Sequence, residues 1–264
     1  LSPGDEIIQS EFGFLVYRLV AQQSGAETIS VPDKKMTADV DGILAAVTDK
    51  TKIVFLANPN NPTGSFLPFD EVKRLHEGLP EDVLLVLDAA YAEYVQRNSY
   101  RAGMELAGSS ENVLMTRTFS KIHGLAALRL GWAYGPKHVI DAINRVRGPF
   151  NLNALAQVAG IAALKDTKFV RNSADFNYKE LRRMIPAINE TGLKAWPSVA
   201  NFVLVEFPEK GDKTAAAANA FLAERGLIVR GVGAYGLDNC LRISVGVKEA
   251  NTAVINALKV FMAK

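Results

Sequence analysis

Two segments of this chain are apolar on consecutive residues, and they constrain the fold more than any other feature. IVFL (53–56) and VLLVL (83–87) have no polar side chain to turn toward water, so a strand formed by either must be covered on both faces. Segments with apolar residues at helical spacing lie between the strand-like runs. This alternation predicts an α/β fold in which helices flank a mostly parallel sheet.

The same patterns divide the chain into a larger and a smaller part. The predicted strands are residues 6–11, 27–32, 52–58, 83–91, 112–118, 130–135, 201–207, 227–230 and 241–245. The predicted helices are residues 14–25, 37–47, 68–79, 214–226 and 248–264, and residues 136–190 are expected to be almost wholly helical with a break at 147–151. We predict a large domain over residues 1–167 and a small C-terminal α+β domain over residues 168–264.

Composition argues against several classes of function. The net charge is +2 and no dense Lys/Arg run occurs, so nucleic acid is not an expected partner. No apolar run approaches the roughly 20 residues that span a bilayer, so no membrane contact is expected. The single cysteine, Cys240, is interpreted as a buried thiol and favours a reducing, cytoplasmic setting. The three histidines are scattered, so no metal site is expected.

The opening residues, LSPGDEIIQSE, have neither an initiator methionine nor a basic n-region. We therefore expect no signal peptide, and we interpret the chain as the later part of a longer protein.

Polar clusters follow three of the predicted strands, at residues 58–64 (NPNNPTG), 88–94 (DAAYAEY) and 117–121 (RTFSK). In parallel α/β sheets ligands bind outside the carboxyl ends of the strands. The three clusters therefore predict one shared site.

Lys121 is the most informative residue of the third cluster. Thr118 and Ser120 precede it, and together with a helix start they would supply hydroxyl and N–H donors to a phosphate, to which Arg129 adds a bidentate contact. Lys121 would then reach the carbonyl of the same ligand and form a Schiff base. The alternative is an N-capped helix with a solvated lysine, and the spacing alone leaves both readings open.

Asp88 ends the apolar strand VLLVLD, where a carboxylate is costly unless a cation or a donor receives it. A protonated pyridine nitrogen is such a partner, and Tyr91 would donate to the ring oxygen beside it. A helix-capping aspartate with a core tyrosine is the open alternative.

Asn61 precedes the rigid Pro62-Thr63-Gly64 turn and is a candidate donor to the same ligand.

Two arginines occupy predicted strands of the small domain. Arg242 lies within LRISVG and Arg230 ends GLIVR. An arginine in an apolar strand needs an anion, either from a protein carboxylate or from a substrate. A structural salt bridge therefore remains open for each.

Four motifs in this order resemble the fold-type I aminotransferases, which use pyridoxal 5′-phosphate: NPNNPTG, DAAYAEY, RTFSKIHGLAALRLGW and LRISVG. Within that group the chain most resembles the histidinol-phosphate aminotransferases, from its first residue to its last. The resemblance implies a mostly parallel sheet with a smaller C-terminal domain, and a homodimer. Family members also carry a segment before the point where this chain starts, which implies an N-terminal truncation.

The resemblance also implies a role for each candidate residue. Lys121 would bind the cofactor covalently and move the substrate proton, and Asp88 would keep the pyridine nitrogen protonated. The other implied cofactor contacts are Tyr91 and Asn61 at O3′, Thr118, Ser120 and Arg129 at the phosphate, and Phe14 on the ring face. Phe14 stands where many relatives have tyrosine. Arg242, with Arg230, would receive the substrate phosphate.

The implied reaction is transamination between L-histidinol phosphate and 2-oxoglutarate, giving imidazole-acetol phosphate and glutamate. Aromatic or broad-range aminotransferases and threonine-phosphate decarboxylases share the lysine and the aspartate and stay as alternatives. A non-catalytic binding or regulatory module of the same fold is a further alternative from a different class.

Overall fold

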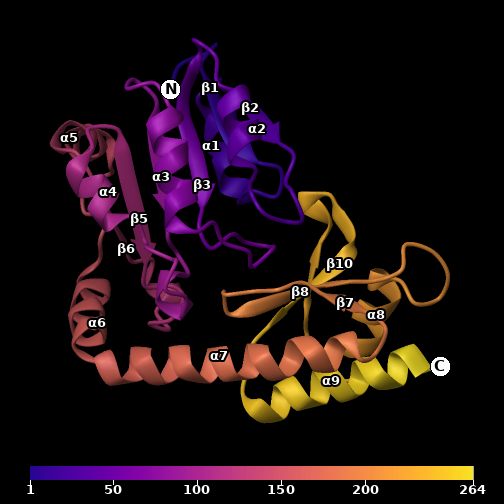
Figure 1. Ribbon diagram of the computed structural model, residues 1–264. Helices are drawn as coiled ribbons and strands as arrows, with labels where there is room; N and C mark the ends of the chain where they lie inside the picture. The colour runs from indigo at the N-terminus through magenta and orange to yellow at the C-terminus, as the bar shows by residue number, and fades with distance from the viewer. Residues whose placement is uncertain (264) are drawn as a thin grey trace.

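The computed structural model of the protein describes residues 1–263, whose strands form two separate sheets (Figure 1). The larger sheet has the order β2-β1-β3-β4-β5-β6. Its strands are β1 (Glu6–Ser10), β2 (Glu27–Val31), β3 (Thr51–Ala57), β4 (Leu84–Asp88), β5 (Val113–Thr118) and β6 (Gly131–Tyr134). All neighbours pair in parallel except β5 and β6, which are antiparallel. The predicted mostly parallel sheet flanked by helices is confirmed.

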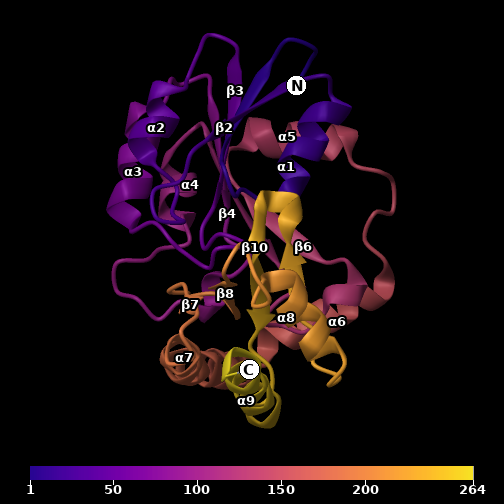
Figure 2. The ribbon, with the colours of Figure 1, turned by 90° about the vertical axis from the view of Figure 1, so that its right-hand side faces the viewer.

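Helices cover both faces of this sheet, as the consecutive apolar residues of its central strands require (Figure 2). One face carries α2 (Val40–Ala45), α3 (Phe69–Gly78) and α4 (Met104–Ser109), and the other carries α1 (Leu15–Gln23) and α5 (Lys137–Val146). Neighbouring residues of β3 alternate accordingly: Val54 packs in the cluster under α2 and α3, and Phe55 packs in the cluster under α1. Fully burying such a side chain contributes about 1.5–3 kcal/mol.

Two further helices connect the sheets. They are α6 (Ala154–Lys165) and α7 (Thr167–Asn189), and α7 runs along the base of the molecule beneath the smaller sheet (Figure 1). The predicted break at residues 147–151 is confirmed. A second break, which the sequence pattern missed, occurs at Asp166, whose carboxylate accepts the Phe169 N–H and caps α7.

The smaller sheet is antiparallel, with the order β7-β8-β10-β9. Its strands are β7 (Lys194–Ala195), β8 (Phe202–Glu206), β9 (Arg230–Val232) and β10 (Leu237–Ser244), and α8 (Ala215–Ala223) and α9 (Lys248–Ala263) pack beside it. Its core lies between β8, β10, α7, α8 and α9.

Three expectations about elements were wrong. The strand expected at residues 227–230 begins only at Arg230, because β10 offers its first partner there and Leu227 and Val229 pack against the core as irregular chain. β10 starts at Leu237, four residues before the predicted 241. The short elements α4 and β7 were not predicted, since neither is long enough to show a period.

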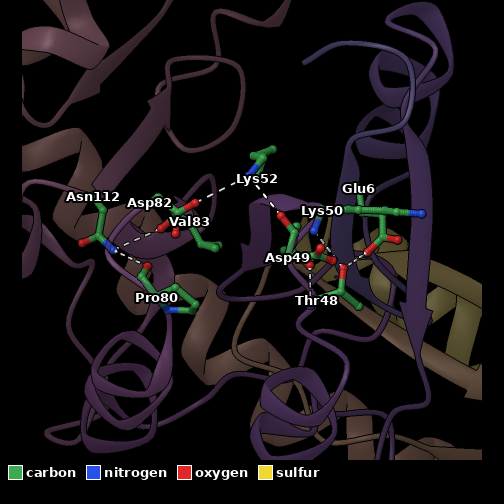
Figure 3. A network of polar contacts seen from close by, with 10 residues as sticks. Glu6, Thr48, Asp49, Lys50, Lys52, Pro80, Asp82, Val83 and Asn112 are labelled. Atoms are coloured by element: carbon green, nitrogen blue, oxygen red, sulfur yellow. Dashed lines mark hydrogen bonds and ion pairs between the residues drawn. The ribbon is translucent and has the colours of Figure 1, made fainter.

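The amino-terminal edge of the large sheet is tied together by polar contacts (Figure 3). Thr48 donates its hydroxyl to Glu6 at 2.6 Å, and Lys52 pairs with Asp82 at 3.5 Å. Asn112 donates to the Val83 carbonyl at 3.1 Å. These contacts link the turns that enter four neighbouring strands, so the edge opposite the polar clusters is structural.

The division into domains of residues 1–167 and 168–264 stays a proposal, and its boundary falls at the first turn of α7. Within the described residues, no helix is both long and apolar enough to cross a membrane.

A buried polar network joins α7, β10 and α9. Asn251 donates to the Glu180 carboxylate at 2.7 Å and to the Gly246 carbonyl at 2.9 Å, and it accepts the Gly246 N–H at 2.8 Å. Asn251→Ala leaves these groups without their partner, so we expect the free energy of unfolding to fall by about 1–3 kcal/mol. Urea denaturation measures this change. The exposed Asn219→Ala on α8 is the matched control, and equal effects of the two substitutions would contradict the assignment.

Candidate active site

The polar clusters meet in a cavity at the carboxyl edge of the large sheet. Parallel register produces this meeting, since Asp88 at the end of β4 pairs with Ala57 on β3 and with Thr116 on β5. The cavity is lined by Phe14, Ala57, Pro59, Asn61, Asp88, Ala90, Tyr91 and Lys121. The sequence-predicted residues Phe14, Asn61, Asp88, Tyr91 and Lys121 therefore share one site.

Lys121 lies on a loop that two buried side chains hold in place. Phe119 packs against Leu130 and Ala156, and Ile122 packs beside Tyr91. The Phe119 carbonyl accepts the Leu125 N–H at 3.0 Å, and the Lys121 carbonyl accepts the Gly124 N–H at 3.0 Å. The sequence reading of a helix beginning here was wrong: the chain turns through bends and a short 3-10 helix (Ala126–Leu128).

The amine of Lys121 is set up to act as a nucleophile. Burial lowers its pKa, the positive charge of Arg242 lowers it further, and the negative charge of Asp88 opposes both. Its Nζ lies 5.2 Å from the centre of the Tyr91 ring. A lysine whose pKa is lowered in this way spends more time as the neutral amine, which is the form that attacks carbonyl carbons.

Asp88 is a half-buried carboxylate with no lysine or arginine at ion-pair distance among residues 1–263. Tyr17 donates its hydroxyl to Asp88 Oδ2 at 2.7 Å, and the Ala90 N–H donates to Oδ1 at 3.2 Å. Burial raises the pKa of Asp88, while these two bonds and the charge of Lys121 lower it. The alternative of a helix cap does not hold, because no α-helix starts at this aspartate.

Tyr17 is a residue that the sequence reading missed. Its ring stacks on Phe55 at 4.5 Å between centroids and meets Phe14 edge-on at 5.8 Å. The Tyr17 side chain thus bonds the Asp88 carboxylate and also supports the aromatic lining of the cavity. A signal was present, since a tyrosine on the buried face of α1, three residues after Phe14, needs a partner for its hydroxyl.

The turn at residues 58–64 is clamped from within. Asn58 exchanges hydrogen bonds with the backbone of Leu67 at 2.9 and 3.0 Å, and Tyr100 donates to the Asn58 carbonyl at 2.8 Å. This rigid base aims Asn61 at the cavity, where its Oδ1 accepts a hydrogen bond from Arg242.

A second group of donors lies beside the lysine loop. Thr118 accepts the Ser120 N–H at 3.0 Å, and Arg129 Nη1 lies 3.5 Å from the Ser120 hydroxyl. Arg129 is exposed and adopts a left-handed backbone with φ +54°, which is uncommon for a residue with a side chain. The structure thus brings together the three residues that the sequence predicted for a phosphate.

The small sheet contributes the two arginines. Arg242 and Arg230 are register partners on β10 and β9. Arg242 also lies over the Phe202 ring at 4.9 Å, and its Nε is buried without a partner. Across residues 1–263 neither arginine forms an ion pair with a carboxylate. The alternative of a structural salt bridge was therefore wrong for both.

Burial also decides the state of Tyr91. It raises the pKa of Tyr91 to about 12, so the phenol keeps its proton at neutral pH and can serve as a donor. Among the charged groups described here, Lys121, Arg129 and Arg242 outnumber Asp88. The site therefore favours an anionic ligand.

Comparison with known proteins agrees with this geometry. The family model described as Aminotransferase class I and II matches residues 1–258. Histidinol-phosphate aminotransferases from Maricaulis maris and from Rhodopseudomonas palustris (strain BisA53) are 55% and 52% identical to the chain. These matches cover 99% and 100% of this chain and 72% of each relative.

Solved structures resemble it over the same length. Histidinol-phosphate aminotransferase from Sinorhizobium meliloti, in complex with pyridoxal-5′-phosphate, has a TM-score of 0.91 and 30% identity, covering 100% of this chain and 72% of that one. L-threonine-O-3-phosphate decarboxylase from Porphyromonas gingivalis has a TM-score of 0.83 and 25% identity, covering 99% and 78%. The chain belongs to the class I and II aminotransferase family.

Proposed function

We propose that this chain carries the catalytic residues of a pyridoxal-phosphate-dependent transaminase that acts on L-histidinol phosphate and 2-oxoglutarate in histidine biosynthesis. One observation supports a phosphorylated substrate. Arg242 and Arg230 are cross-strand partners beside the Lys121 cavity, and no described carboxylate neutralises them. The relatives at 52% and 55% identity, which bear the corresponding name, support the same substrate.

The residues of the cavity fit pyridoxal phosphate. A protonated ring nitrogen needs an anion, and Asp88 is a half-buried carboxylate without a cationic partner in the described chain. The phosphate needs donors, which Thr118, Ser120 and Arg129 supply. Phe14 offers an apolar face to the ring, and Tyr91 and Asn61 stand as polar contacts for its oxygen.

When bound, the cofactor supplies an electrophilic carbonyl and an electron-withdrawing ring. Lys121 Nζ would hold it covalently and would then carry the proton removed from the substrate α-carbon. Asp88 would hold the proton on the ring nitrogen. Tyr91, whose hydroxyl keeps its own proton, would donate to the ring oxygen.

The paired arginines would orient the substrate by its anionic group. A phosphate carries more charge than a carboxylate and accepts several donors at once, so two guanidinium groups suit it better than one. The same Arg242 would receive the α-carboxylate of glutamate in the other half of the exchange.

The alternatives share the same cavity. Because the chain is also similar to a threonine-phosphate decarboxylase, threonine phosphate is the second phosphorylated substrate to be tested. We further propose a homodimer in the cytoplasm, on the resemblance and on the single buried Cys240. The absence of nucleic acid and membrane partners stays a prediction.

The function is tested by the visible absorption of the chain loaded with pyridoxal phosphate. We expect histidinol phosphate to abolish the band of the lysine-bound cofactor and 2-oxoglutarate to restore it. Lys121→Ala should have no such band, because no other amine in the cavity replaces it, while Lys137→Ala on exposed α5 should behave as the parent chain. A band that persists in Lys121→Ala would refute the lysine assignment. A normal band that histidinol phosphate does not change would refute the substrate, and titration with threonine phosphate and phenylalanine would then identify the donor.

Arg242→Ala should weaken histidinol phosphate far more than the cofactor. Loss of a hydrogen bond to a charged group costs about 1.5–3 kcal/mol, so we expect KM to rise by at least tenfold or so while the dissociation constant of pyridoxal phosphate stays nearly constant. Steady-state kinetics and cofactor titration measure the two effects. Equal losses for substrate and cofactor would contradict the role.

Tyr17→Phe should shift the acidic limb of the pH–rate profile upward. The active form of Asp88 is the carboxylate, so activity falls as the pH drops through its pKa. The Tyr17 bond lowers that pKa, so its removal raises it and moves the limb to higher pH. Tyr100→Phe is the matched control, because it loses a 2.8 Å bond to a backbone carbonyl instead. An unchanged limb in Tyr17→Phe would exclude this coupling.

A further inference from the structure

The tip of the β9–β10 hairpin carries a tyrosine that none of the roles above uses. Tyr235 ends the 3-10 turn Gly233–Tyr235, and Gly236, with φ +79°, closes it by donating its N–H to the Gly233 carbonyl at 2.8 Å. In both views the tip reaches from the small sheet toward the loops of the large sheet (Figures 1 and 2), and in Figure 2 it lies below α1. The hairpin thus carries one aromatic side chain from the small sheet toward the large one.

The Tyr235 ring packs among residues of both sheets. It packs against a buried cluster of the small sheet, and Phe12 and Met36 from the large-sheet loops pack against the same cluster. The cluster consists of Leu204, Val232, Leu237 and Cys240. Because residues from both sheets fix the ring, the position of its hydroxyl is set by the tertiary structure.

Two groups of the large domain face the Tyr235 oxygen. The Leu15 N–H at the start of α1 and the Asn61 side chain both act on it and lower its pKa. Burial raises the pKa of Tyr235, so the hydroxyl keeps its proton. Within residues 1–263 no acceptor receives that proton, which leaves it available to a ligand.

The arginine pair lies near this hydroxyl. The charges of Arg242 and Arg230 both lower the pKa of Tyr235. Asn61 links the two groups, since its Oδ1 accepts a hydrogen bond from Arg242 and its side chain also lowers the Tyr235 pKa. Two guanidinium groups and one free O–H therefore stand near one another, and among residues 1–263 no carboxylate is paired to either arginine. Such a set of donors recognises a tetrahedral dianion better than a planar carboxylate.

We propose that Tyr235 donates its hydroxyl to the phosphate of the amino substrate, as the third donor beside Arg230 and Arg242, and so favours phosphorylated substrates over unphosphorylated ones. The proposal rests on the proposed function for the identity of that substrate. It assigns Tyr235 to substrate binding and leaves the proton transfer at Lys121 untouched.

The test compares Tyr235→Phe with the parent chain, both loaded with pyridoxal phosphate so that the cofactor phosphate site is filled. Inorganic phosphate is the binding probe, measured by calorimetry, and histidinol phosphate and histidinol are the substrates. We expect the phosphate Kd and the KM for histidinol phosphate to rise about tenfold, with kcat and histidinol turnover little changed. Tyr178→Phe on α7, away from the cavity, is the matched control and should equal the parent chain.

The outcomes separate this proposal from the proposed function. If Tyr235→Phe binds phosphate as tightly as the parent chain, or if neither binds phosphate, the assignment of Tyr235 is overturned. If the parent chain does not convert histidinol phosphate but phosphate binding still weakens about tenfold in the variant, the proposed function fails and the tyrosine–anion contact stands. Equal losses for histidinol and histidinol phosphate would also overturn it, since a merely structural role lowers both. The visible cofactor band checks that the variant is folded.

Discussion

The site depends on one constraint, which is the parallel register of β3, β4 and β5. Asp88 pairs with Ala57 on one side and with Thr116 on the other, so the three loops that follow these strands begin at the same level. The ends of the apolar runs fix this register, because a slip would draw the Asp88 carboxylate into the apolar part of the sheet, where losing its water is costly. The polar residues need no attraction for one another to meet, since the sheet brings them together.

The cost of this arrangement is a carboxylate and an amine in a partly dry cavity. Asp88 has a raised pKa and Lys121 a lowered one, each mainly through burial. The protonated ring nitrogen of a bound cofactor would stabilise the Asp88 carboxylate, and the carbonyl of the cofactor would react with the neutral Lys121 amine. Tyr17 keeps the carboxylate hydrogen-bonded in the meantime. The shifted pKa values of Asp88 and Lys121 are therefore the physical basis of the proposed chemistry.

The small sheet adds a second layer of charge. Arg230 and Arg242 lie opposite each other on neighbouring strands, an arrangement that is destabilising for like charges. The Asn61 bond to Arg242 crosses from the large sheet to the small one, so the anion site depends on the placement of both sheets. An anion bound between the two guanidinium groups would offset this repulsion.

The sequence by itself determined the sheet, the helices that flank it and the residue types at its carboxyl edge, because apolar periodicity and turn chemistry are local. It also indicated Lys121, Asp88 and the two arginines, each with an open alternative that local spacing did not resolve. Three points needed the tertiary structure: within residues 1–263 Arg230 and Arg242 have no carboxylate partner, no helix starts at Lys121, and Tyr17 bonds Asp88 across 71 positions of the chain. No pattern in the sequence predicted that the Tyr235 hydroxyl lies near the two arginines. Contacts between distant residues follow from how two sheets pack, and no short pattern encodes that packing.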